Sequence, residues 1–110
     1  MEKRSKPECA LPRIKELATR QAVHYASSRV QNHTDALEYS FETVCECLAQ
    51  LAPEDFHHAE RYSADGHWLD VYLMTFIGPS NHEDDLYIKL KLTSDCLCVV
   101  LLSFHAEGAL

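Results

Sequence analysis

The chain has 110 residues, of which 46% are hydrophobic, and it carries a formal net charge of −7. This size and composition predict one globular domain over residues 1–110, and no apolar run approaches the ~20 residues that a membrane-spanning helix needs. The basic start, residues 1–6, is followed by no apolar segment, so we expect no signal peptide and a cytoplasmic location.

The first predicted element is a helix over residues 12–20. Leu11, Ile14 and Leu17 recur at intervals of three residues and form one apolar stripe. Pro12 suits the first turn of a helix, where its missing N–H would have no partner in any case.

Two short elements are expected next. The run 22–25 contains valine and tyrosine, which favour strands. Ser27 or Ser28 then caps a short helix that ends near Asn32, because a serine side chain accepts hydrogen bonds from the first helical turn.

A third helix is predicted over residues 40–50, with Ser40 as its N-cap. Pro53 ends the helical pattern and turns the chain. The apolar stripe of this helix consists of Phe41, Val44, Cys45, Leu48 and Leu51.

The second half of the chain has a strand pattern. Strands are expected over 56–63, 67–77, 85–93 and 97–105. Asp65-Gly66 is a hairpin signal between the first two strands, and Ser94-Asp95 marks a tight turn into the last. Helices followed by an antiparallel meander predict an α+β fold, with the helices packed on one face of a mostly antiparallel sheet.

The run 86–92 alternates strictly between apolar and polar residues. Its leucines and isoleucine would face the core, while Tyr87, Lys89 and Lys91 would face outward together. We also expect Trp68 to lie in the core and Asp70 to orient a neighbour by hydrogen bonding.

The chain has five cysteines, and because this number is odd they cannot all pair in disulfides. Zinc ligands usually converge in C-x-x-C pairs, whereas both cysteine pairs here are C-x-C. Reduced, partly buried thiols are therefore expected, with no metal and no cofactor.

Motifs along nearly the whole chain resemble the motility quorum-sensing regulator (MqsR) toxins of type II toxin–antitoxin systems, within the RelE- and YoeB-like group. The resemblance lies in their combined order and spacing. The matching residues are Met1-Glu2-Lys3-Arg4, Pro7, Leu11, Lys15-Glu16-Leu17, Leu51-Ala52-Pro53-Glu54-Asp55-Phe56, Tyr62-Ser63, Trp68, Asp70-Val71-Tyr72, Tyr87-Ile88-Lys89 and Ser103-Phe104.

The resemblance implies a RelE/YoeB-like fold and a metal-independent endoribonuclease that cleaves mRNA, stops translation and is neutralised by a cognate antitoxin. The family's groove carries a lysine after Asp-Phe, a glutamine after the tryptophan, a tyrosine before Ile-Lys and a lysine after Ser-Phe. In this chain those positions hold His58, Leu69, Tyr87 and His105.

Cleavage of RNA without a metal needs a base for the 2′-hydroxyl, an acid for the leaving 5′-oxygen and positive charge at the phosphate. Imidazoles supply both proton transfers near neutral pH. We therefore assign His58 and His105 as the acid–base pair and Tyr87 as a phosphate ligand. Positive charge for substrate binding would come from Arg61, Lys89 and Lys91.

Each candidate also has a purely structural interpretation. His58 would be a solvated residue at a strand start, His105 an exposed residue near the end of the sequence, and Tyr87 an ordinary sheet residue. Lys89 and Lys91 would form the solvated face of an amphipathic strand, or guard an edge.

Three functions compete at this point. The first is an mRNA-cleaving toxin, which binds mRNA and an antitoxin. The second is a catalytically degenerate relative that acts as a protein-binding module, which the negative net charge favours because RNA-binding surfaces are normally basic. The third, a small metal-binding protein, rests only on the number of histidines and cysteines.

Overall fold

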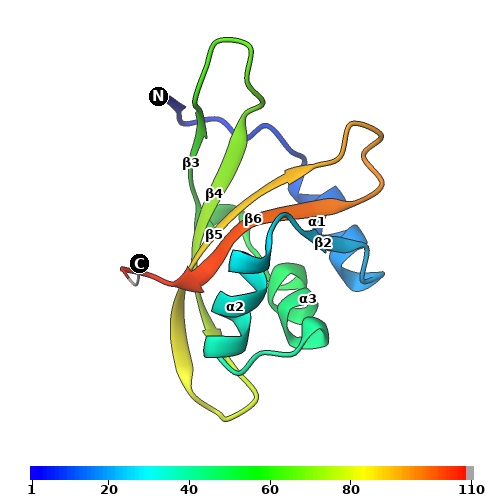
Figure 1. Cartoon of the computed structure of the whole chain (residues 1–110), viewed down its shortest axis with the longest axis vertical. Coiled ribbons are helices and arrows are strands. Elements are labelled where there is room, and N and C mark those ends of the chain that lie inside the picture. Colours follow the sequence, from blue (N-terminus) through cyan, green and yellow to red (C-terminus); the bar gives the residue numbers. More distant parts are fainter. Residues whose placement is uncertain (109–110) are drawn as a thin grey trace.

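The computed structural model describes residues 1–108 and has the predicted α+β fold (Figure 1). The helices are α1 (Leu11–Thr19), α2 (Ser28–Ala36) and α3 (Phe41–Ala49), followed by the short 3₁₀ turn η1 (Pro53–Asp55). The strands are β1 (Glu2–Arg4), β2 (Val23–Tyr25), β3 (Phe56–Arg61), β4 (Leu69–Ile77), β5 (Glu83–Leu92) and β6 (Val99–Ala106).

All six strands belong to one sheet, in the order β1-β3-β4-β5-β6-β2. The four central strands form an antiparallel meander, as the sequence predicts. The short strand β2 adds to β6 in parallel, pairing Val23 with Val99 and Tyr25 with Leu101. β2 pairs with only the first three residues of β6, so it does not cover the remaining residues of that strand.

The three helices cover one face of the sheet (Figure 1). Ile14, Leu17 and Leu48 are fully buried from the helix side. Leu86, Ile88 and Leu90 are fully buried from β5, so the predicted alternation of that strand is confirmed. The opposite face, which carries Tyr87, Lys89 and Lys91 from β5, is called the open face below.

Two details of the helices were tested by the structure. Ser40 caps α3 as predicted, because its Oγ accepts a hydrogen bond from the Thr43 N–H at 3.1 Å. The helix expected to end near Asn32 runs on to Ala36, and Ser27 caps it without a side-chain hydrogen bond. The extra turn is held by burial of Thr34 rather than by a local capping signal.

The first residues form a strand that the sequence did not indicate. β1 pairs antiparallel with β3, although Glu-Lys-Arg has no apolar pattern. The following segment is fixed by the fully buried Asp70, whose two carboxylate oxygens each accept a backbone N–H at 2.9 Å, from Glu8 and from Cys9. Asp70 thus has the predicted hydrogen-bonding role.

Two turns and one aromatic residue differ from expectation. The β3–β4 connection is a longer loop, in which Gly66 closes a turn on Ser63 instead of forming a two-residue hairpin. Cys96 lies in the β5–β6 turn with a φ of 59°, so the last strand begins at Val99 and not at residue 97. Trp68 is half-buried, not in the core, because Arg4 and Arg61 stack on its ring.

No helix among residues 1–108 has both the length and the apolar character needed to cross a bilayer.

Candidate functional site

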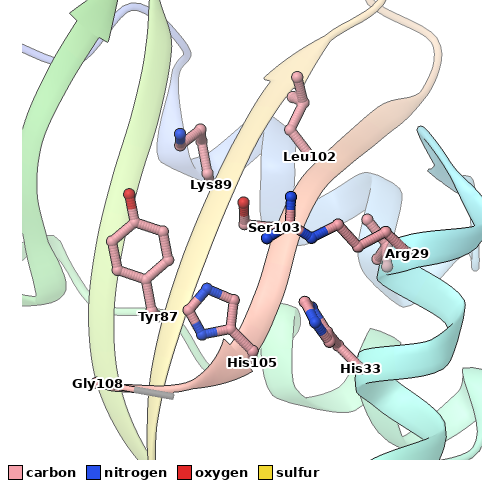
Figure 2. A pocket seen from close by; sticks show the side chains of 9 residues that line it. Arg29, His33, Tyr87, Lys89, Leu102, Ser103, His105 and Gly108 are labelled. Atoms are coloured by element: carbon pink, nitrogen blue, oxygen red, sulfur yellow. The ribbon is translucent and has the colours of Figure 1, made fainter. Parts of the chain in front are cut away.

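A pocket of about 440 Å³ opens between β5, β6 and helix α2. Figure 2 shows its polar side chains converging from these three elements. It is lined by Arg29, Val30, His33, Tyr87, Lys89, Leu102, Ser103, His105 and Gly108. Two of the predicted catalytic residues, Tyr87 and His105, and the predicted binding residue Lys89 therefore share one hollow.

The register of β5 against β6 places these residues together. Tyr87 pairs with His105, and Lys89 pairs with Ser103, so all four side chains lie on the open face. Paired residues on antiparallel strands have Cβ atoms ~5 Å apart. The strand pattern alone therefore puts an imidazole beside a phenol and a hydroxyl beside an ammonium.

Helix α2 supplies the opposite wall with Arg29 and His33. These residues are four apart on a helix and therefore lie on the same side of it. The helix lies beside β6, beyond the residues of that strand with which β2 pairs (Figure 1). The sequence analysis missed both residues, and the i, i+4 spacing of two basic side chains was the only signal that pointed to them.

The ring of His105 is fixed by three neighbours. It stacks on Tyr87, with ring centroids 5.0 Å apart and an interplanar angle of 10°, and it meets the edge of His33 at 5.4 Å. Its Nδ1 lies 2.8 Å from the backbone oxygen of Ala106. A carbonyl oxygen only accepts, so Nδ1 carries the proton and Nε2 keeps its lone pair in the neutral ring.

Tyr87 and Lys89 are both held in their protonated forms. Burial raises the pKa of Tyr87, so its hydroxyl stays a hydrogen-bond donor at neutral pH. Burial alone would lower the pKa of Lys89, but the hydrogen bond to Tyr62 and the nearby Tyr87 and Glu60 raise it. Lys89 is therefore a fixed positive charge and not a base.

A buried carboxylate stands beside the pocket on β3. Glu60 accepts hydrogen bonds from Tyr62 Oη at 2.7 Å and His58 Nε2 at 2.8 Å, and its Oε2 lies 3.2 Å from Lys89 Nζ. Burial would raise the pKa of Glu60, but the bonds from Tyr62 and His58 and the charge of Lys89 lower it overall. Part of the charge of Lys89 is thus already neutralised.

The structure does not bring His58 to His105. His58 is on β3, three strands away from β6, a separation of roughly 14 Å at the usual spacing of strands. Both of its ring nitrogens are occupied, Nε2 by Glu60 and Nδ1 by His57 at 2.7 Å. His58 therefore belongs to the Glu60 cluster and, among the described residues, not to the lining of the pocket.

The other two predicted binding residues also lie outside this pocket. Arg61 is bonded to Glu2 at 3.0 Å and stacks on Trp68, so it supports β1. Lys91 lies on the open face one step beyond Lys89 and lines a neighbouring hollow. The family position after the tryptophan, Leu69, is buried on β4.

The cysteines are all free thiols, and three of them are buried. Over residues 1–108, no three side chains of histidine, cysteine, aspartate or glutamate converge as metal ligands. What the pocket offers chemically is two imidazoles, one of them with an oriented lone pair, together with a phenol, a hydroxyl, an ammonium and a guanidinium.

A family model described as "Motility quorum-sensing regulator, toxin of MqsA" matches residues 6–106 of the chain. This range includes all three helices and every residue discussed above that lines the pocket, except Gly108. No curated protein matches the chain.

Proposed function

The chain belongs to this family of toxins from toxin–antitoxin systems, and from that membership and the pocket we propose that it is an endoribonuclease that cleaves mRNA. In this proposal, cleavage stops translation in the cytoplasm, and a cognate antitoxin of the MqsA kind binds the toxin and neutralises it. The wider RelE/YoeB-like grouping stays a prediction.

The observation that carries the proposal is the orientation of His105. Its Nδ1–H is committed to the Ala106 carbonyl, which leaves the lone pair of Nε2 to act as the base. Nε2 takes the proton of a 2′-hydroxyl while that oxygen attacks the adjacent phosphorus. The new O2′–P bond replaces the P–O5′ bond, which gives a 2′,3′-cyclic phosphate and a free 5′-hydroxyl.

The second proton transfer is assigned to His33. It lies against His105 on the same hollow, and as an imidazolium it donates a proton to the leaving 5′-oxygen. In this proposal His33 replaces His58 as the partner of His105 in the acid–base pair, because the ring nitrogens of His58 are occupied elsewhere.

Positive charge and hydrogen bonds at the phosphate come from three further groups. Lys89 and Arg29 stand on opposite sides of the hollow, so both sides of a bound phosphate would meet a cation (Figure 2). The Tyr87 hydroxyl donates because burial keeps it protonated. Fixed donors of this kind stabilise the charge that develops on the phosphorane.

The proposal is tested with purified protein, a single-stranded RNA and excess EDTA over pH 5–8. A base and an acid that act together give a bell-shaped dependence of kcat/KM on pH. The products should carry a 2′,3′-cyclic phosphate, which mass spectrometry detects. Absence of cleavage across this range would overturn the proposal.

A second function, a non-catalytic module that binds a protein partner, is favoured by one observation. The carboxylate of Glu60 forms an ion pair with Lys89, which leaves less of the lysine's positive charge for binding RNA. This alternative predicts tight binding of the antitoxin together with no cleavage of RNA by the isolated protein at any pH.

A further inference from the structure

A second hollow adjoins the pocket on the open face of the sheet. It lies over the end of β5 and β6 that is nearest β2, and Leu102 lines both hollows. Its lining consists of His24, Ala26, His67, Lys91, Leu92, Thr93, Ser94, Val100 and Leu102. The two hollows therefore form one track that runs along β5.

The charge of this track contrasts with that of the molecule. The chain has 17 acidic and 10 basic residues, yet among residues 1–108 no aspartate or glutamate lines either hollow. Four of the seven histidines line them, together with Arg29, Lys89 and Lys91. Positive and titratable groups are thus concentrated along a single path, which fits a ligand with repeated negative charges.

The spacing along β5 suits a polymer better than a single anion. Lys89 and Lys91 point to the same face two residues apart, about 7 Å along the strand. This step is comparable to that between successive phosphates of an extended nucleic acid chain. His24 and His67 flank Lys91 from β2 and from the β3–β4 loop.

We infer that the second hollow is a subsite for the neighbouring phosphate of single-stranded RNA, held by Lys91 with His24 and His67. The inference rests on the proposed function, since it extends the substrate beyond the phosphate that is cleaved. Leu102 separates the two phosphate positions and offers an apolar surface to the base or sugar between them. The protein would therefore prefer substrates longer than a dinucleotide.

The test compares binding of a dinucleotide and a pentanucleotide, both made non-cleavable by 2′-O-methyl groups, by fluorescence anisotropy. In wild-type protein the pentanucleotide should bind more tightly. Lys91→Gln should weaken the pentanucleotide several-fold and lower the slope of log Kd against log salt concentration by about 0.7, the value for one phosphate contact on a single strand. His67→Gln should weaken it in the same direction.

Arg20→Gln is the matched control, because Arg20 is exposed at the end of α1, on the helix side of the molecule. It removes one positive charge and should leave the slope unchanged. Circular dichroism verifies that each variant is folded.

Failure of the subsite and failure of the nuclease proposal give different results. If wild-type protein cleaves RNA but Lys91→Gln and His67→Gln bind the pentanucleotide like wild type, the subsite is wrong and the nuclease proposal stands. If wild-type protein neither binds nor cleaves RNA, both are wrong.

Discussion

One hydrogen bond determines which ring nitrogen of His105 can act as a base. The Ala106 carbonyl fixes the proton on Nδ1, and the stacked Tyr87 ring fixes the plane of the imidazole. We expect His105→Ala to lower kcat for RNA cleavage by ~10²–10⁴-fold, because a positioned general base contributes that much. Single-turnover cleavage assays measure this.

His82→Ala is the control for this prediction, since His82 is exposed in the β4–β5 hairpin. His58→Ala provides a second comparison. If His105→Ala cleaves at the wild-type rate, His105 is not the base, and the acid–base pair of His58 and His105 expected from the sequence is wrong as well. Loss of cleavage in both His58→Ala and His105→Ala would support that pair.

Glu60 links stability to pH. Its pKa is lowered in the folded protein, so its ionised form stabilises the fold above the unfolded value of ~4.3 and loses this effect as pH falls through the folded value. We expect Glu60→Gln to lower the free energy of unfolding by ~1–3 kcal/mol at pH 7, since hydrogen bonds to a charged group are weakened.

Urea denaturation at pH 7 and at pH 3.5 measures this effect, with the exposed Glu54→Gln as control. The loss should shrink at the lower pH, because pH 3.5 lies below the unfolded pKa of ~4.3 and the stabilising effect of the ionised form fades as pH falls towards the lowered folded pKa. A loss of the same size at both values would mean that the charge of Glu60 does not stabilise the fold.

At the scale of the elements, Asp70 joins the N-terminal segment to the centre of the sheet. Asp70→Ala would leave the backbone N–H groups of Glu8 and Cys9 without their acceptors. We expect a loss of ~1–3 kcal/mol, because a buried unsatisfied donor costs about that much. Thermal unfolding measures the loss, and limited proteolysis before residue 8 should become faster.

Asp65→Ala is the control, because Asp65 is exposed in the β3–β4 loop. An unchanged melting temperature and unchanged proteolysis in Asp70→Ala would show that the N-terminal segment is held by other contacts.

The elements were predictable where the apolar pattern was long. The meander of β3 to β6 and the third helix follow from periodicity, and the resemblance pointed to Tyr87 and His105. The strand β1 was not predictable, because its pairing with β3 depends on a distant backbone and not on its own side chains. The contribution of α2 to the pocket was missed for a similar reason. It depends on how far β2 extends along β6, which the sequence around α2 does not indicate.

At the scale of the whole molecule, the reactivity of the thiols measures how accessible the interior of the fold is to solvent. Cys96 is exposed, Cys98 is half-buried, and Cys9, Cys45 and Cys47 are buried. Burial raises the pKa of Cys9 and of Cys45 to about 11, which leaves little reactive thiolate at pH 8.

We therefore expect Ellman's reagent at pH 8 to modify Cys96 first, Cys98 more slowly and the remaining three only after denaturant is added. The stoichiometry is read from the absorbance with time, and Cys96→Ser removes the fast phase. Rapid modification of all five thiols in the native protein would mean that the helical layer opens readily.

The parallel pairing of β2 with β6 has a consequence for biogenesis. Residues 23–25 pair with residues 99–101, which are far away in the sequence. Pairings between such distant residues form slowly during folding. Arg29 and His33 are likewise made long before His105. During translation the pocket therefore stays incomplete until residue 105 has been synthesised.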